Sequence, residues 1–301
     1  MIYFPTTSLF VEGPDCSGKT TLIKNIHRLS KYRWHIQDRS HLSRKIFNDL
    51  YCRNNDNDNF NFHLEASNLN NRFIFLLPAL DEIVRRFNER GDDIHKDVES
   101  IEKVYDAFKS EVSNISGYPN FIFCFSSDID SKIESIVSSI KKFETFGIVE
   151  ISECVKDFVR FNRNESYPLS FTIYEDGKFD DSGLKLMSYG PEREYYDTIY
   201  RTFHNKITSE LEGKNMHNRR ESQSSRRFVY TDNSCISFIQ AAIRYNVLDF
   251  NVVIRSSDVE NTFSHDLAFL YYLAGSCFER FSEFCDKVRM RFNLNSAHII
   301  G

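Results

Sequence analysis

Apolar positions in the first third of the chain switch between short continuous runs and runs with helical spacing. A continuous run ends at Glu12, and apolar residues then recur with a helical period through Leu22 and Ile26 to Leu29. The run Arg72–Leu77 is also continuous, which is typical of a strand buried on both faces of a parallel sheet. The remaining pattern predicts a short strand at Tyr32–Ile36, a loop at Asn54–Asn61, a helix from Pro78 and a helix from Asp97 to about Val112. Strands alternating with helices predict an α/β domain with a parallel sheet and helices on both faces.

A change in composition separates this region from the rest of the chain. Turn-forming residues gather at Asn114–Pro119, and a new apolar run, Phe121–Phe125, begins after them. We therefore predict one domain over residues 1–115 and a second over residues 116–301. In the second domain the pattern predicts helices at 128–143, 151–161 and 267–284, a strand at 167–174 that turns at 175–178, and paired strands on either side of Tyr245-Asn246.

Composition and charge narrow the functional classes. Hydrophobic residues make up 41% of the 301 residues, and 28 Phe with 15 Tyr are expected to fill the cores. The net charge of −5 argues against nucleic acid or an anionic membrane as partner. No signal peptide and no apolar run near the ~18 residues that span a bilayer are found, so we expect a cytoplasmic location. The seven cysteines lack CxxC spacing, which argues against a disulfide framework or a zinc ribbon.

The candidate chemistry begins at residues 9–23, LFVEGPDCSGKTTLI, where a strand, a glycine loop and a helix follow one another. The GxxxxGK[ST] pattern is filled by Gly13, Gly18, Lys19 and Thr20, and this order predicts a cradle of backbone N–H groups around a polyphosphate. We expect Lys19 to reach the β- and γ-phosphates and the Thr20 hydroxyl to hold Mg²⁺, with ATP as the nucleotide. The neighbouring Ser17 and Thr21 are further phosphate-binding candidates. The alternative is a glycine turn before an ordinary helix.

Charged residues beyond the loop supply the other candidates of the first domain. Asp38 and Arg39 follow the second predicted strand, and ligands of open α/β sheets lie at the carboxyl ends of strands. Asp38 is a candidate to orient the phosphate acceptor or the metal shell. Arg85, Arg86 and Arg90 lie on the helix after Pro78 and suit the charge neutralisation that phosphoryl transfer needs, although a solvated helix face is the alternative.

These motifs resemble thymidylate kinases and related deoxynucleotide kinases over about residues 8–110. The resemblance lies in FVEGPDCSGKTTL, in Asp38-Arg39-Ser40 and in the arginine-bearing helix that ends in RGDD. It implies a P-loop kinase domain in which Asp15 contacts the sugar of a deoxynucleoside monophosphate. It also implies that Arg39 holds the acceptor phosphate and that Arg85, Arg86 and Arg90 are lid arginines.

The second domain carries four segments in an informative order: Ser188-Tyr189-Gly190, Ser225-Arg226-Arg227, Cys235, and Arg255-Ser256-Ser257-Asp258. Together they resemble the thymidylate synthase and deoxycytidylate hydroxymethylase superfamily over about residues 145–301. The resemblance implies an α+β fold and a homodimer, because the family's arginine pair, here Arg226-Arg227, reaches across a dimer interface.

The same resemblance implies how a pyrimidine monophosphate would be bound and modified. Cys235 matches the nucleophile that adds to C6, so that C5 attacks a one-carbon unit from methylenetetrahydrofolate. Arg226, Arg227 and Arg255 would bind the nucleotide phosphate and favour the thiolate. The remaining counterparts are Tyr189, Ser256 and Asp258 in the nucleotide site, His298 at the sugar, and Asp157 or Glu153 as general acid or base.

Asp266 bears on the identity of the base. The family's synthases, which act on uracil, have asparagine at the matching position and its hydroxymethylases, which act on cytosine, have aspartate, so the resemblance implies that Asp266 contacts the base. A protonated carboxyl, or a carboxylate beside a protonated N3, complements cytosine, so the resemblance favours dCMP over dUMP. The alternative is that Asp266 is the first-turn acid of the following helix. Cys235 has the alternative of a buried strand cysteine, and the arginine pair that of a hydrated basic loop.

We therefore weigh three functions for the whole chain. The preferred one is a two-domain enzyme that phosphorylates a pyrimidine deoxynucleoside monophosphate and transfers a one-carbon unit to C5 of dCMP or dUMP, leaving methyl or hydroxymethyl open. The second keeps the kinase and makes the other domain a non-catalytic module for nucleotide binding or dimerisation. The third is a kinase acting on modified bases in DNA, which the acidic net charge disfavours.

Overall fold

A computed structural model describes residues 2–53, 57–90, 95, 97–162, 168–179, 193–212 and 228–299. The chain divides into two compact bodies. The first body is Thr6–Glu144, and the second combines Met1–Pro5 with Thr145–Gly301. Both are mixtures of helices and strands, and parallel strand pairing occurs in each.

The predicted boundary between residues 115 and 116 is wrong, because it cuts through the first body. The apolar run after it is strand β5 (Phe121–Cys124), which pairs in parallel with β4 (Asn71–Leu76). The turn-forming segment before it only connects a helix to this strand. Turn residues also mark connections within a domain, so composition alone could not separate the two.

The first body is built on a four-stranded parallel sheet in the order β3-β2-β4-β5. Strand β2 (Ser8–Glu12) lies between β3 (Ile36–Asp38) and β4. The chain moves from β2 to one neighbour and later returns to the other, so the strand order reverses between β2 and β4. Ligands of open α/β sheets bind at such a point, beyond the carboxyl ends of the strands.

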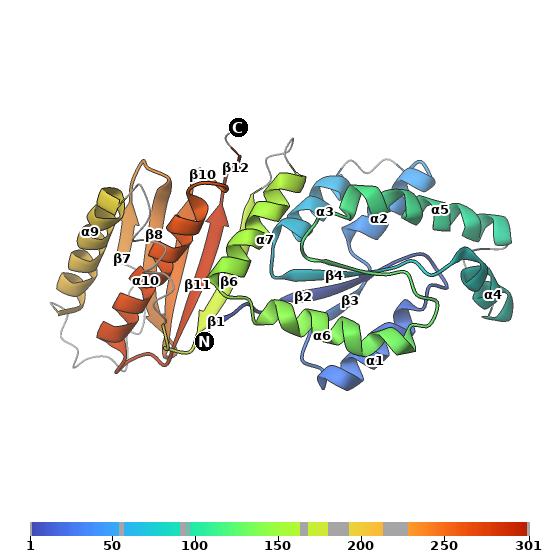
Figure 1. Ribbon diagram of the computed structural model, residues 1–301, viewed down its shortest axis with the longest axis horizontal. Coiled ribbons are helices and arrows are strands. Elements are labelled where there is room, and N and C mark those ends of the chain that lie inside the picture. The colour runs from blue at the N-terminus through green and yellow to red at the C-terminus, as the bar shows by residue number, and fades with distance from the viewer. Residues whose placement is uncertain are drawn as a thin grey trace. The chain divides into compact units, whose positions relative to one another are not determined.

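Helices cover both faces of this sheet, as predicted (Figure 1). One face packs on α1 (Lys19–Ser30) and α6 (Ile133–Glu144), through a core that includes Val11, Leu22 and Ile136. The opposite face is aromatic: Phe73 stacks between Phe10 and Phe121 and meets Phe62 edge-on. The helices on that side and at the sheet's end are α2 (His41–Leu50), α3 (Asn57–Ser67), α4 (Leu80–Arg90) and α5 (Val98–Ile115), and the short η1 (Asp130–Lys132) precedes α6.

The loop predicted at Asn54–Asn61 is helical from Asn57 onward. The many Asn and Asp residues suggested a turn, but Phe62 and Ala66 of α3 lie four residues apart and are buried against the aromatic face. Tertiary burial therefore outweighs the local preference of Asn and Asp.

The second body is a six-stranded sheet in the order β1-β6-β11-β9-β8-β7. Strand β11 pairs in parallel with β9, and every other neighbouring pair is antiparallel. The strands are β1 (Ile2–Tyr3), β6 (Leu169–Glu175), β7 (Phe228–Thr231), β8 (Ile236–Arg244), β9 (Val247–Ile254) and β11 (Lys287–Leu294), with a separate parallel pair of β10 (Ser257–Asp258) and β12 (Ala297–His298).

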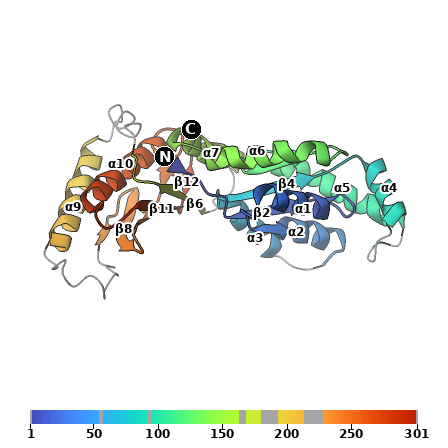
Figure 2. The same ribbon diagram turned by 90° about the horizontal axis from the view of Figure 1, so that it is seen from below.

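Within the described residues, the helices that accompany this sheet are α7 (Ile148–Phe161), α9 (Arg193–Glu212) and α10 (Phe263–Phe281). Helices α7 and α10 lie on the same face of the sheet (Figure 2). The predicted hairpin at Tyr245-Asn246 is confirmed: both residues have positive φ, 50° and 61°, as a two-residue hairpin turn requires. No helix in the described part of the chain combines the length and apolar character needed to cross a membrane.

Candidate functional site

The glycine loop, residues 13–18, leaves the carboxyl end of β2 and enters the first turn of α1. Gly13 has φ +142° and Gly18 φ +99°, backbone conformations that residues with a Cβ rarely adopt. A Cβ on Gly13 would lie 2.3 Å from the carbonyl oxygen of Leu76 at the end of β4. The two glycines are therefore required by the backbone itself, at the point where the strand order reverses.

Lys19 directs its ammonium back into the loop. Nζ donates hydrogen bonds of 3.0 Å to the carbonyl oxygen of Gly13 and 2.8 Å to that of Pro14, and the residue is only 7% exposed. Burial lowers the pKa of Lys19 to about 8, and the nearby Arg39 guanidinium acts in the same direction. The Asp15 and Asp38 carboxylates oppose this shift. The two hydrogen-bond acceptors described for this ammonium are neutral carbonyls, so replacing them with an anion would stabilise the buried positive charge.

The side chains around the loop fit the polyphosphate and Mg²⁺ that the sequence predicts. Among the described residues, the Ser17 hydroxyl is buried and has no hydrogen-bond partner, so it retains the capacity to bond a ligand. Thr20 and Thr21 are exposed in the first turn of α1, where the helix dipole favours an anion. Thr20 would hold the metal, and Lys19 and the loop N–H groups the phosphates.

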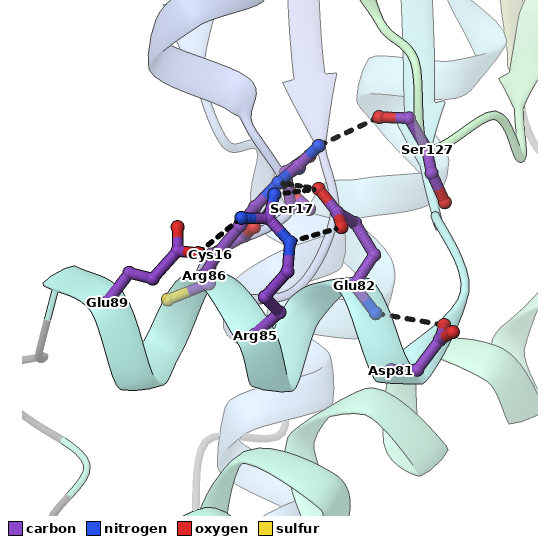
Figure 3. Close-up of polar contacts among 8 residues, drawn as sticks. All are labelled: Cys16, Ser17, Asp81, Glu82, Arg85, Arg86, Glu89 and Ser127. Atoms are coloured by element: carbon purple, nitrogen blue, oxygen red, sulfur yellow. Dashed lines mark hydrogen bonds and ion pairs between the residues drawn. The ribbon is translucent and has the colours of Figure 1, made fainter.

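Arg86 on α4 braces the loop from outside (Figure 3). Its guanidinium donates to the carbonyl oxygen of Ser17 at 3.0 Å and to that of Ser127, after β5, at 2.8 Å. Glu82 accepts from Nε of Arg86 at 2.7 Å and orients the guanidinium. Arg86 therefore joins the loop after β2 to the segment after β5, two strands away in the sheet.

The three predicted lid arginines lie in different environments. Arg85 is 54% exposed and pairs with Glu82 and Glu89 of its own helix. Arg86 and Arg90 instead line a cavity of about 380 Å³ beside Gly18 and Thr21. Arg85 thus lies on a solvated helix face, which was the alternative to a lid role. Arg86 and Arg90 lie where a nucleotide could reach them.

A second cavity, of about 680 Å³, opens on the other side of the loop. Asp15, Asp38 and Arg39 line it, as the sequence predicts, together with the rings of Phe47 and Tyr51. Arg39 forms an ion pair with Asp15, and its guanidinium lies over the Phe47 ring, 4.7 Å from the centroid. His95 Nε2 also lies 3.1 Å from Asp15. The Asp15 carboxylate and the Arg39 guanidinium therefore meet in one cavity.

Glu12 is a polar residue of the site that sequence reasoning missed. Its side chain is completely buried, and its carboxylate accepts hydrogen bonds from the Ser40 backbone N–H and the Ser43 hydroxyl. Burial raises the pKa of Glu12, and the hydrogen bonds from Ser40 and Ser43 act against that shift. A charged residue closing an apolar strand was the available signal.

In the second body, Cys235 and Arg255 are neighbours through their main chains. The Arg255 backbone N–H donates to the Cys235 carbonyl oxygen at 2.8 Å, because the two residues flank the paired strands β8 and β9. Both are exposed, so Cys235 is not the buried strand cysteine weighed as its alternative. The Tyr195 hydroxyl contacts Ser234 Oγ at 2.7 Å and accepts from the Ile236 N–H at 3.1 Å, which fixes the backbone on either side of Cys235.

The residues after Arg255 are joined to the chain's last described segment. Asp258 pairs with His298 in the parallel ladder of β10 and β12, and His298 Nδ1 lies 3.5 Å from Ser256 Oγ. Asp266 lies in the first turn of α10 and is 1% exposed. It accepts hydrogen bonds from the Tyr196 hydroxyl at 2.9 Å and the Ser257 hydroxyl at 3.2 Å, so groups of the chain itself occupy both carboxylate oxygens.

Further candidates of the second body remain: Asp157, Tyr189, Arg226 and Arg227. Asp157 lies on α7, is 57% exposed and pairs with Arg160, which in turn binds Glu260. Tyr189, Arg226 and Arg227 lie outside the described residues.

The chain was compared with protein families, with curated proteins and with solved structures. No protein-family model matches the chain, and no curated protein matches it. Among solved structures, thermostable thymidylate synthase A from Bacillus subtilis shares 18% identity with a TM-score of 0.23, over 28% of this chain and 33% of that one. The match spans a third of the synthase.

Proposed function

We propose that the first body is a P-loop kinase that transfers the γ-phosphoryl group of ATP to a pyrimidine deoxynucleoside monophosphate. The observation that supports this most is the position of Lys19. Its buried ammonium lies within a two-glycine loop, at the carboxyl end of a central parallel strand and the start of a helix. Cavities border the loop on both sides, one for each nucleotide.

The residues divide the work of phosphoryl transfer as follows. Bound Mg²⁺ and ATP supply the transferable group and neutralise part of its charge. Lys19 exchanges its two carbonyl partners for phosphate oxygens, and the Ser17 hydroxyl and the loop N–H groups donate to the same anion. Arg86 holds the loop in place through the Ser17 carbonyl oxygen. Catalysis is by positioning and charge, with little covalent chemistry required of the protein.

The larger cavity suits the acceptor. Arg39 offers a guanidinium for the acceptor phosphate, and Asp15 offers a carboxylate for a sugar hydroxyl. Phe47 and Tyr51 provide apolar surface for a base. Because Arg39 and Asp15 now bind each other, the acceptor would replace that ion pair with contacts to itself.

A panel of nucleoside monophosphates incubated with ATP and Mg²⁺, read as ADP release, tests this function and identifies the acceptor. Release that depends on one pyrimidine deoxynucleotide supports the proposal. Absence of release with every acceptor, from a folded chain, refutes it.

We propose, as a second candidate, that the second body binds a pyrimidine nucleotide and uses the Cys235 thiolate for folate-dependent C5 transfer, acting as a homodimer. It is supported by the backbone contact between exposed Cys235 and Arg255, which brings to one end of β8 and β9 the two residues that the resemblance assigns to the nucleophile and the nucleotide phosphate. Tritium release from C5-labelled dCMP or dUMP with methylenetetrahydrofolate, compared between wild type and Cys235→Ala, is the test. Nucleotide binding without release would instead indicate the non-catalytic module.

A further inference from the structure

We propose that Glu12 is a positioning residue that fixes the acceptor arginine, Arg39, relative to the glycine loop. The inference rests on the proposed kinase function. Glu12 is the last residue of β2 and directly precedes Gly13, so it belongs to the strand that carries the loop. Its side chain points instead to the segment after β3, where Arg39 lies.

The carboxylate joins β2 to the start of α2. Ser40 is the N-cap of this helix, and its backbone N–H donates to Oε1 of Glu12. The Ser43 hydroxyl, one turn into the helix, donates to Oε2. A carboxylate at the positive end of a helix is favourable, and its two donors compensate for the loss of water. Both oxygens are therefore used to hold one helix end.

This contact stabilises an unusual backbone at Arg39. Arg39 has φ +77°, a left-handed conformation that a residue with a Cβ rarely adopts. Its N–H donates to the Val11 carbonyl oxygen at 3.0 Å, and the next N–H, of Ser40, donates to Glu12. Two successive residues of β2 therefore hold two successive amides, and the turn between them directs the Arg39 guanidinium to Asp15 and Phe47.

The consequence is that β2 carries both halves of the site. Its main chain continues into the loop that binds the phosphate donor, and its last side chain fixes the arginine that binds the acceptor. Removing the carboxylate leaves the hydrogen bonds of Lys19 and the brace from Arg86 in place, since neither involves Glu12. Loss of the Glu12 carboxylate should therefore weaken acceptor binding more than ATP binding.

The test compares Glu12→Ala and Glu12→Gln in the full chain, using whichever of dTMP, dUMP and dCMP the wild type phosphorylates best. We expect Glu12→Ala to raise the KM for the acceptor at least tenfold, while the Kd for a fluorescent ATP analogue changes less than twofold. Glu12→Gln should recover most of this loss, because its amide can still accept from Ser40 and donate to the Ser43 oxygen.

Glu144→Ala is the matched control. Glu144 is another buried carboxylate of the same body, bound by the Trp34 indole N–H at 2.8 Å and by Arg33. The Glu144→Ala substitution should lower the Tm without changing the acceptor KM or the Kd for the ATP analogue. An unchanged acceptor KM in Glu12→Ala, or equal losses of ATP and acceptor binding below its Tm, would overturn the proposal. If Glu12→Ala does not fold, Ser43→Ala gives the same comparison with one hydrogen bond removed. A wild-type chain that transfers no phosphoryl group would refute the kinase function itself.

Discussion

Arg86 donates a hydrogen bond of 3.0 Å to the backbone carbonyl oxygen of Ser17, and so holds the glycine loop from a helix almost seventy residues away. Arg86→Ala should let the loop relax onto Lys19 and weaken ATP binding about tenfold, the equivalent of one charged hydrogen bond. Arg85→Ala is the control, because Arg85 is exposed and pairs only with residues of its own helix among the contacts described. Calorimetric titration with MgATP distinguishes them, and equal losses in both variants would count against a specific brace.

Gly13 should not tolerate a side chain. Gly13→Ala forces a Cβ to within 2.3 Å of the Leu76 carbonyl oxygen at φ +142°, so we expect a loss of about 1–3 kcal/mol in unfolding free energy. Urea denaturation measures this, with Gly147→Ala as the control. Gly147 has an ordinary φ of −82°, and its nearest contact is the flexible Glu150 side chain. A Gly13→Ala protein as stable as the wild type would show that the loop backbone differs from the one described.

ATP binding should weaken as the pH rises through about 8. The pKa of Lys19 is lowered to about 8 by burial, so the free enzyme loses the ammonium above that pH, whereas bound phosphate favours the charged form. The apparent affinity should therefore fall by up to about tenfold per pH unit, with proton uptake on binding. Affinities measured between pH 7 and 9 test this. In Lys19→Arg, whose charge persists, a pH dependence equal to that of the wild type would contradict the assignment.

The first residues of the chain should stabilise the second body rather than the first. Strand β1 pairs with β6, and Phe4 is completely buried against Phe171 and Phe146. Phe4→Ala should cost about 3–5 kcal/mol. Thermal unfolding measures the loss of stability, and hydrogen exchange should locate it in residues 145–299. Val149→Ala, at a 56% exposed position, should leave the stability nearly unchanged. Loss of protection confined to Thr6–Glu144 would be the contrary result.

The sequence predicts local structure well where one residue type has a single physical role. Gly13 and Gly18 place the loop between strand and helix, and Tyr245-Asn246 marks the hairpin. Strand β11 was overlooked, although its residues alternate between buried and less buried positions with the period of a strand. The domain boundary failed because β5 joins the first sheet only through its pairing with β4, a contact between segments distant in sequence.

The candidate site also contains residues that the sequence predicts and contacts that it does not. The residues proposed to bind phosphate are adjacent in the sequence, so a motif can name them. The contacts of Arg39 with Asp15, and of Glu12 with Ser40, depend on the parallel alignment of β2 with β3, in which Val11 lies opposite Asp38. No local pattern encodes that alignment, and these contacts could be found only in three dimensions.

The central claim, that residues 13–20 bind the polyphosphate of the phosphate donor, is tested most directly by transfer of radiolabelled γ-phosphate from ATP to the acceptor in wild type and Lys19→Ala. We expect transfer by the wild type, and a loss of at least a hundredfold in Lys19→Ala with its Tm within a few degrees of the wild type. Full transfer by Lys19→Ala would contradict it.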